Sequence, residues 1–361
     1  MTERSLQDRV VGAIMGAFIG DALALGPHWY YDLNALRANY GPWISDYTAP
    51  KPGWYHAGMK AGQSSQAGVL LALTLRSLVD AGGYDEADFC RRMDEDFFPL
   101  IDGTPMRGPG GYTSQSIRSA WQLRVQAGLP WGEVAGNADT TEAAERTLAI
   151  AIRYAFEPAE LASAVSRNTL LTQNDGTVLA MTVAYGAVLG MLIEGHPLDT
   201  ALSSKLMARV KSGQLPFHAV TAENLQAPKT SQRETFRPGS FPSPDALLTP
   251  SNIAAAAIDP DIDINPAWKV SLVYGMPCAV YHQFPAAYYL AARFANNFEL
   301  AVLNAVNGGG QNQARAILTG ALVGAQAGIS GIPERFLTGL ENAQAYLDDA
   351  KRLADQVCQH A

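Results

Sequence analysis

Carboxylate, imidazole and aromatic side chains lie close together in residues 16–32, which have the sequence GAFIGDALALGPHWYYD. A carboxylate stabilises developing positive charge and an imidazole transfers protons near neutral pH, so Asp21 and His28 are candidate catalytic residues. Trp29 and Tyr30 offer rings that can stack on a planar ligand. The structural alternative is that Asp21 satisfies backbone groups in the core, that His28 is hydrogen-bonded there, and that the aromatic residues form a packing cluster.

A glycine turn precedes a helix near the other end of the chain, in the segment NAVNGGGQNQARAILTGALVGAQAG, residues 304–328. A glycine turn that opens a helix exposes backbone NH groups, which suits an anion such as a phosphate. The turn matches neither the dinucleotide-binding fingerprint nor the P-loop, because no strand is predicted before it and no Lys-Ser/Thr pair follows. The candidate ligand-binding residues of this segment are Gly309, Gly310, Gln311, Gln313 and Arg315.

Two further helix starts contribute polar residues. Asp175, in the segment NTLLTQNDGTVLAM, is either a candidate catalytic carboxylate or the N-cap of the helix that follows it. Tyr112 lies in a glycine-containing loop and is a candidate ligand-binding residue, unless the loop is an ordinary helix start. Asp32 is a further carboxylate close to His28. Carboxylates close to an imidazole suit general acid-base catalysis.

The elements that must position these residues are helices. Ala and Leu recur at three- and four-residue spacing while alternation with β-branched residues is scarce, so the sequence predicts an all-α fold. The proline-rich stretch at about 214–268 is predicted to be a surface excursion or lid on a single domain spanning 1–361, with an interdomain linker as the alternative. Predicted helices cover residues 5–25, 65–81, 85–97, 113–127, 140–156, 158–169, 175–194, 197–213, 278–293, 296–307, 312–328 and 333–357.

Rows of glycine mark two of these helices. Gly12, Gly16 and Gly20 are four residues apart, and the helix at 312–328 carries a second row at the same spacing, Gly320, Gly324 and Gly328. Each helical glycine costs about 1 kcal/mol relative to alanine, so three on one face call for a compensating gain. Close backbone approach supplies that gain. We therefore expect the two helices to lie near the centre of the fold and to cross each other.

Composition limits the class of protein. The 361 residues are 48% hydrophobic and 17% charged with a net charge of −8, which favours a large core and gives no general attraction for nucleic acid or anionic membranes. The apolar segment 10–25 is too short to span a membrane and contains Asp21. Cys90, Cys278 and Cys358 are far apart and fit neither a disulfide framework nor a zinc cluster. These features predict a cytoplasmic protein without nucleic-acid or membrane partners, and they leave the oligomeric state open.

The two glycine segments together resemble the ADP-ribosylglycohydrolase family, which includes dinitrogenase-reductase activating glycohydrolases and J-type crystallins. The resemblance rests on GAFIGDALALGP near one end and AVNGGGQNQARAILTGALVGAQAGISGIP near the other, with GQSSQAGVLLAL at 62–73 in the place of a second motif. It implies a compact orthogonal helical bundle that binds ADP-ribose or a related ribosylated compound. It also implies that Ser65 and Gln66 belong to the ligand site.

The chain departs from the family pattern where the resemblance implies two magnesium ions. Family members carry a Thr-Asp-Asp-Thr motif and a late Asp-x-Asp-Thr motif that hold the ions. Magnesium prefers carboxylate oxygens, so neutral side chains at these places predict no metal site and no cofactor. The matching residues here are Ser65, Gln66, Ala67 and Gly68 for the first motif, and Gln311, Asn312, Gln313 and Ala314 for the second.

The sequence therefore favours a hydrolase that acts on a ribosylated or nucleotide-like small molecule without the dimagnesium centre. Asp21, His28 and Asp175 are its candidate catalytic residues. A non-catalytic ligand-binding or structural member, like the crystallins of the family, is the alternative. A different metal, or a phosphate of the substrate in the place of magnesium, is a third interpretation.

Overall fold

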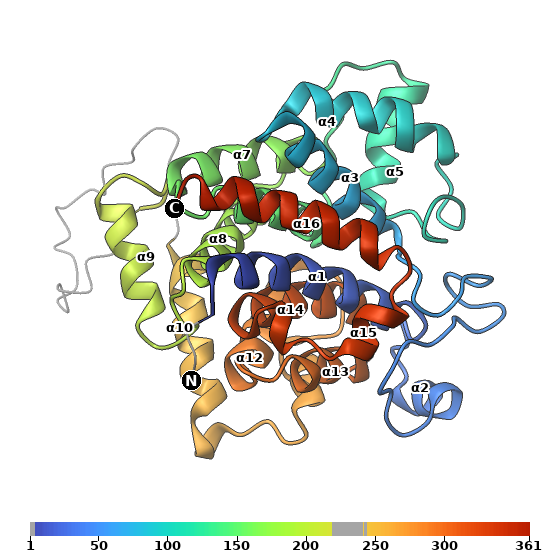
Figure 1. Cartoon of the computed structure of the whole chain (residues 1–361). Coiled ribbons are helices and arrows are strands. Elements are labelled where there is room, and N and C mark those ends of the chain that lie inside the picture. Colours follow the sequence, from blue (N-terminus) through green and yellow to red (C-terminus); the bar gives the residue numbers. More distant parts are fainter. Residues whose placement is uncertain (1–3, 219–240, 242–243) are drawn as a thin grey trace, which may run out of the picture.

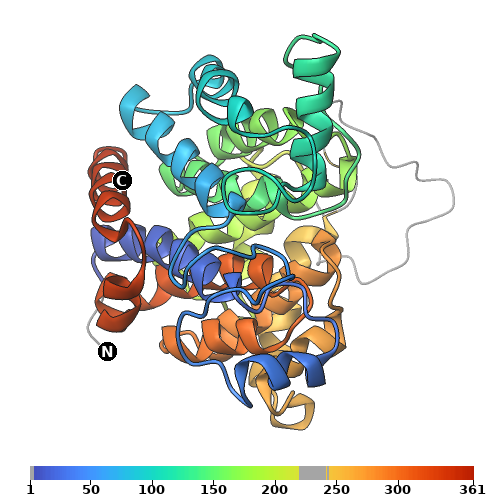
Figure 2. The same cartoon turned by 90° about the vertical axis from the view of Figure 1, so that its right-hand side faces the viewer.

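The predicted all-α fold is confirmed in the computed structural model, which describes residues 4–218, 241 and 244–361 (Figure 1). Within these residues there are sixteen α-helices, and the only β-type pairs are isolated bridges. Helices from both ends of the chain meet in the middle of the molecule (Figures 1 and 2). Of the proline-rich excursion, residues 219–240, 242 and 243 lie outside the described part.

Helices α1 (Leu6–Leu25) and α14 (Asn312–Ala327) form the centre of the fold, as the glycine rows predict. A Cβ atom built on Gly16 would lie 2.2 Å from the carbonyl oxygen of Gly320, and one built on Gly324 would lie 2.1 Å from that of Gly12. These distances are too short for any side chain, so the two backbones are in direct contact. The pairing of early with late positions makes the helices antiparallel.

Further helices cover this pair on both sides. Helix α16 lies along one side of α1, and α12 and α13 pack against α14 (Figure 1). Helices α3, α6, α7 and α8 form the part of the molecule built by the middle of the chain (Figure 2). The bounds are Gln66–Ala81 for α3, Glu142–Arg153 for α6, Pro158–Leu170 for α7, Gly176–Ile193 for α8, Val280–Arg293 for α12, Phe298–Asn307 for α13 and Ala343–Cys358 for α16.

Shorter helices complete the described fold. Helix α8 is the one described helix long and apolar enough to cross a membrane, and 72% of it is buried inside the protein. The remaining α-helices are α2 (Leu33–Tyr40), α4 (Glu86–Arg92), α5 (Gln115–Trp121), α9 (Leu202–Lys211), α10 (Asp245–Ile258), α11 (Val270–Tyr274) and α15 (Glu334–Gly339). Single π-turns at Met93–Phe97 and Gln122–Gln126 extend α4 and α5.

Four elements differ from the sequence prediction, one of them the short helix α11, which was not predicted. The predicted helix 333–357 is two helices, because Leu340 is extended and Asn342 has φ = 61°, which ends α15 and redirects the chain. Helix α10 lies inside the proline-rich stretch, with Pro250 buried in it, and packs against α9 and α12. Helix α2 was not predicted and begins at Asp32, whose carboxylate caps it.

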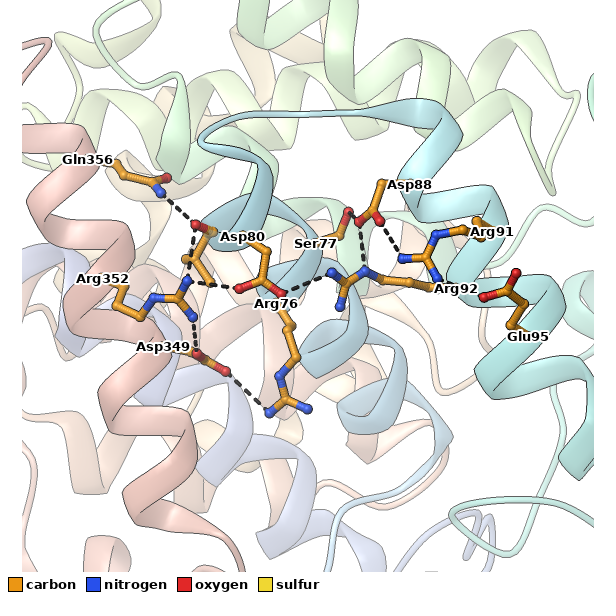
Figure 3. Close-up of polar contacts among 11 residues, drawn as sticks. Arg76, Ser77, Asp80, Asp88, Arg91, Arg92, Glu95, Asp349, Arg352 and Gln356 are labelled. Atoms are coloured by element: carbon orange, nitrogen blue, oxygen red, sulfur yellow. Dashed lines mark hydrogen bonds and ion pairs between the residues drawn. The ribbon is translucent and has the colours of Figure 1, made fainter.

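An ion-pair network fixes the side of α3 that faces α16 and α4 (Figure 3). Arg352 of α16 donates to Asp80 of α3 at 2.8 Å and to Asp349 at 3.2 Å. Arg76 of α3 reaches Asp349 at 3.3 Å, and Arg92 of α4 reaches Asp80 at 2.9 Å. Each exposed pair contributes at most about 1 kcal/mol, but the network links three helices. It helps to hold α3, whose first turn carries Ser65 and Gln66.

Candidate functional site

The carboxylate of Asp21 lies beneath the first turn of α3. It is fully buried and accepts hydrogen bonds from the backbone NH of Ser65 at 2.9 Å and from its hydroxyl at 2.5 Å. Gly68 leaves room for it, because a Cβ there would lie 2.2 Å from Oδ2 of Asp21. Burial raises the pKa of Asp21 to about 7, and the bonds from Ser65 act against that rise. Asp21 therefore positions the N-terminus of α3 and does not line the cavity described below.

The glycine turn before α14 pairs with the exit of α1. The backbone NH of Gly310 donates to the carbonyl of Tyr30 at 2.8 Å, and the NH of Trp29 donates to the carbonyl of Gly310 at 3.1 Å. Gly309 and Gly310 have φ values of 62° and 61°, a region that favours glycine. The two motifs from opposite ends of the chain thus form one loop cluster, and its turn geometry explains why both residues are glycine.

Arg315 holds this turn from inside the protein. Its side chain is fully buried and donates to the carbonyl oxygens of Ala305 at 3.0 Å and Gly309 at 2.6 Å, and to Oε1 of Gln283 at 3.3 Å. Burial without a carboxylate partner lowers its pKa to about 9. Arg315 is therefore engaged with the backbone of the turn and is not among the residues that line the cavity.

Two histidines are joined between the glycine loops. Nδ1 of His28 lies 2.6 Å from Nε2 of His56, and Nε2 of His28 lies 2.5 Å from Oε1 of Gln311. At the other end, Nδ1 of His56 lies 2.5 Å from the carbonyl oxygen of Gly110. Both rings are almost completely buried, and burial lowers the pKa of each, that of His56 to about 4. His56 was not selected from the sequence, because it has no motif around it.

These groups border a cavity of about 110 Å³. Its wall comes from the exit of α1, the starts of α3, α5, α6 and α14, and the loops between them. It is polar on several sides and includes two aromatic rings, Trp29 and Tyr112, whose centroids are 4.5 Å apart. The lining residues are His28, Trp29, His56, Ser65, Gln66, Ala67, Leu70, Tyr112, Ser114, Gln115, Arg118, Thr140, Glu142, Glu145, Cys278, Gln311 and Gln313.

Two glutamates at the start of α6 bring carboxyl groups into this wall. Glu142 accepts from the backbone NH of Ser116 at 3.1 Å, and Glu145 accepts from the hydroxyl of Thr141 at 2.6 Å. Burial raises the pKa of Glu145 to about 8, so its carboxyl group carries a proton at neutral pH. A neutral acid and a carboxylate that accepts a backbone hydrogen bond thus line the same cavity, and Arg118 adds a guanidinium to it.

Several polar atoms around the cavity have no partner within the described residues. The indole NH of Trp29 and the amide NH₂ groups of Gln66 and Gln313 are buried donors without an acceptor, and the hydroxyls of Ser114 and Thr140 are also unpaired. A buried polar group left unpaired costs about 1–3 kcal/mol. These five atoms border one cavity, so a polar ligand that enters it can complete their hydrogen bonds.

Backbone strain is concentrated at the same place. Three non-glycine residues of the described chain have positive φ, and two of them, Trp29 and His56, both at 62°, line the cavity. A residue with a side chain in the left-handed region costs about 1–3 kcal/mol unless its surroundings enforce it. The fold accepts this cost at two residues that face one cavity, which is typical of binding and catalytic sites.

The structure brings together most, but not all, of the residues predicted from the sequence. His28, Trp29, Ser65, Gln66, Tyr112, Gln311 and Gln313 line the cavity. Asp175 does not: its side chain accepts from the NH groups of Thr177 and Val178 and caps α8, so the N-cap interpretation describes its position. Tyr30 is buried behind the cavity, where it stacks on Trp54 at 4.4 Å. Gly309 and Gly310 form the supporting turn.

Sequence reasoning missed the two glutamates, Arg118, Cys278 and His56. Glu142 and Glu145 are three residues apart in the first turn of a predicted helix. Acidic residues are common there because the positive end of the helix dipole stabilises their negative charge. What distinguishes these two glutamates is that both lie on the side of α6 that faces the cavity. That direction depends on packing of distant helices and is not visible in the local sequence.

The side chains in the two family motifs do not fit a pair of magnesium ions. Gln66 uses its amide oxygen to accept from the NH of Ser114, so its free group is an NH₂ donor, and Gln313 also leaves its NH₂ unpaired. Gln311 contacts His28, and Asn312 retains one unpaired neutral oxygen. Magnesium requires oxygen ligands, carboxylates above all. Among the described residues, no group of three or more His, Cys, Asp and Glu side chains is arranged to hold a metal ion.

Comparison with known proteins places this architecture. The sequence model of the ADP-ribosylglycohydrolase family matches residues 2–361. A solved structure described as an ADP-ribosylglycohydrolase-related protein complex is similar with a TM-score of 0.60 and 18% identity, covering 98% of this chain and 99% of that one, which shows the shared fold. No curated protein matches the sequence. Since the family match covers nearly the whole length, the chain belongs to the ADP-ribosylglycohydrolase family.

Proposed function

We propose that this protein binds a ribosylated small molecule in the cavity and hydrolyses its glycosidic bond by acid-base chemistry that needs no magnesium. One observation carries the proposal: the carboxyl groups of Glu142 and Glu145 line one cavity, and five further polar atoms around that cavity lack hydrogen-bond partners. Family membership supports a glycohydrolase in general terms, and the cavity residues supply the specific chemistry.

The size of the cavity limits what enters it. Pockets that enclose whole drug-sized ligands have volumes of roughly 300–1,000 Å³. The 110 Å³ cavity therefore admits one sugar-sized part of the ligand. The ribose ring offers hydroxyl oxygens that can accept from the unpaired donors of Trp29, Gln66 and Gln313. The remainder of an ADP-ribose-like ligand extends past Tyr112 in the cavity wall toward Tyr55, and both half-buried rings are available for stacking.

The two glutamates have separate roles in the proposed reaction. Glu145 donates its proton to the leaving group as the bond from C1 of the ribose to that group breaks. Glu142 stabilises the positive charge that develops on the sugar and takes a proton from the water that attacks C1. The products are the free ribosyl hydroxyl and the protonated leaving group, so one water molecule is consumed. No step requires a charge other than those of the side chains around the cavity.

The roles of Asp21 and His28 change in this scheme. Asp21 fixes the start of α3 through Ser65 and is a positioning residue. His28 contacts Gln311 and His56 and belongs to the wall that faces the ligand. Asp175 has no part, because it caps α8 away from the cavity. The catalytic carboxyl groups thus come from α6 and not from the three carboxylates selected in the sequence.

The test combines binding with turnover. We expect calorimetry to detect binding of ADP-ribose in the presence of EDTA, and hydrolysis of ADP-ribosylated arginine or serine to proceed there too. Glu145→Gln and Glu142→Gln are each expected to lower kcat by about 10²–10⁴-fold, the usual contribution of a general acid or base. Because the proton of Glu145 is lost near its pKa of about 8, kcat should fall as the pH rises above that value.

A matched control and a clear alternative complete this design. Glu133→Gln, on an exposed residue next to the same region of the chain, should leave kcat unchanged. ADP-ribose binding with no turnover of any ribosylated substrate would favour the non-catalytic alternative, a ligand-binding member of the family. Binding that appears only with magnesium would contradict the metal-independent mechanism, and absence of binding by all ribosyl compounds would reject the ligand class.

A further inference from the structure

The two buried histidines connect a backbone carbonyl to an amide in the cavity wall. The order of atoms is the carbonyl oxygen of Gly110, Nδ1 and Nε2 of His56, Nδ1 and Nε2 of His28, and the side-chain amide of Gln311. The three contacts measure 2.5, 2.6 and 2.5 Å. Each of them is short enough to require one proton between the two heavy atoms.

The carbonyl of Gly110 sets the donor-to-acceptor direction of this series of hydrogen bonds. A carbonyl oxygen only accepts hydrogen bonds, so Nδ1 of His56 must carry a proton. With two protons on the pair, both rings are uncharged: Nε2 of His56 is bare and accepts from Nδ1 of His28, and Nε2 of His28 is bare as well. A bare nitrogen can only accept. Gln311 must then turn its NH₂ group toward His28 and its oxygen away.

A third proton on the histidine pair reverses the direction of the hydrogen bond between His28 and Gln311. Nε2 of His28 then carries a proton and donates to Oε1 of Gln311, the amide atom that lies 2.5 Å from that nitrogen in the structure. One of the rings is an imidazolium, and the NH₂ group of Gln311 points away from His28. The two states differ by one proton and by a half-turn of one amide.

We propose that the number of protons on the His28–His56 pair decides which end of the Gln311 amide meets the ligand. With two protons, Gln311 offers an oxygen that accepts from a ligand hydroxyl. With three protons, it offers an NH₂ group that donates to a ligand oxygen, such as that of a carboxylate or phosphate. The histidine pair thus determines which ligand group Gln311 can bind. This inference rests on the proposed function of the same cavity.

Burial sets the balance between the two states. It lowers the pKa of both rings, so the third proton is bound only on the acidic side and the two-proton state prevails at neutral pH. Asp21 and Arg315 lie on the neighbouring helices α1 and α14. The other titratable groups that line the cavity with the pair are Tyr112, Arg118, Glu142, Glu145 and Cys278.

Nitrogen NMR of the full-length protein, labelled with ¹⁵N in its six histidines, reads the proton positions directly. At pH 7.5 we expect protonated Nδ1 and bare Nε2 on both rings, with assignments from the His56→Gln variant. On acidification, one proton should enter and shift the signals of both rings together. A bare Nδ1 on His56, or two rings that titrate independently, would overturn the proposal. This readout needs neither ligand nor turnover, so it is separate from a failure of the proposed function.

Substitution of the amide gives a second test with a matched control. Gln311→Glu replaces a group that can turn with a carboxylate that only accepts, so it should stabilise the three-proton state and raise the proton affinity of the pair at least 100-fold. Gln313→Glu places the same charge in the same cavity wall, on a side chain with no contact to either histidine recorded in the described structure. It should raise the affinity far less. If both variants raised the proton affinity of the histidine pair equally, the effect would come from the added negative charge and not from the contact between Gln311 and His28. That result would reject the proposal.

Discussion

At the scale of single residues, burial changes what the acids of this protein do. Asp21 and Glu145 are both shielded from water, and burial raises the pKa of the first to about 7 and of the second to about 8. The two nevertheless differ in position. Asp21 is engaged with Ser65 below the cavity, whereas Glu145 lines it. A raised pKa alone therefore does not single out the acid of the proposed reaction, and access to the cavity is needed as well.

Asp21 contributes to the pH dependence of stability. Its pKa is about 7 in the folded protein against 3.8 in the unfolded chain, so the folded state holds the proton that the unfolded state releases between these values. Stability is thus greatest below pH 4 for this group and falls as the pH rises toward 7, by an amount on the order of 4 kcal/mol. Asp21→Asn mimics the protonated form, because its amide can accept from the NH of Ser65 and donate to the hydroxyl.

We expect the midpoint of thermal unfolding to depend less on pH between 5 and 8 in Asp21→Asn than in the unchanged protein. Unfolding followed by circular dichroism at several pH values measures this slope. The exposed carboxylate of Asp32, which caps α2, gives the control Asp32→Asn, whose slope should stay the same. An unaltered slope in Asp21→Asn would mean that Asp21 is ionised in the folded protein at pH 5.

At the scale of elements, backbone contact between α1 and α14 decides where the cavity forms. The backbones of these helices are in contact at Gly16 and Gly320. The C-terminal end of α1 and the N-terminal end of α14 therefore lie together, which places His28 next to the glycine turn. The N-termini of α3, α5 and α6 point at the same region and supply Ser65, Gln115 and Glu142. Helix starts therefore surround the cavity, and the positive ends of their dipoles favour acceptors on a bound ligand.

The glycine contact predicts a steep cost for the smallest side chain. In Gly324→Ala the new Cβ would lie 2.1 Å from the carbonyl oxygen of Gly12, so the two helices must separate. We expect the free energy of unfolding to fall by about 3 kcal/mol or more, at the upper end of overpacking effects. Denaturant titration measures it.

A helical glycine with open space around it provides the control for that substitution. No atom lies within 4 Å of a Cβ built on Gly176, in the first turn of α8. Gly176→Ala should leave stability unchanged or raise it by up to about 1 kcal/mol. Equal effects at the two sites would show that α1 and α14 do not depend on backbone contact.

At the scale of the whole molecule, the protein has the family fold, and its cavity is lined by both amide and carboxyl side chains. Helices from both ends of the chain form one core, and the family match extends over residues 2–361. The places of the two family motifs hold amides and small side chains that do not fit magnesium ions. The carboxyl groups near the cavity belong to Asp21, Glu142 and Glu145, and burial raises the pKa of the first and the last.

Magnesium should therefore contribute little to the stability of the folded protein. A ligand at 100 times its Kd stabilises the folded state by about 2.7 kcal/mol, enough to move the midpoint of unfolding by several degrees. We expect 10 mM magnesium chloride to shift that midpoint by less than about 1 °C relative to sodium chloride of equal ionic strength, because neutral amides bind the ion poorly. A larger, saturable shift that EDTA reverses would contradict the metal-independent site.

Local patterns in the sequence determined the helical class and the contact between the two glycine rows, because both depend on spacing along single elements and so are visible without coordinates. The resemblance of the two glycine segments to the family predicted that His28 and Gln311 belong to one site. Only the tertiary structure decided that Asp21 and Arg315 are buried supports, that Asp175 caps α8, and that His56 and Glu145 face the cavity. The direction of a side chain and its access to water depend on how distant helices pack, and no local pattern encodes that arrangement.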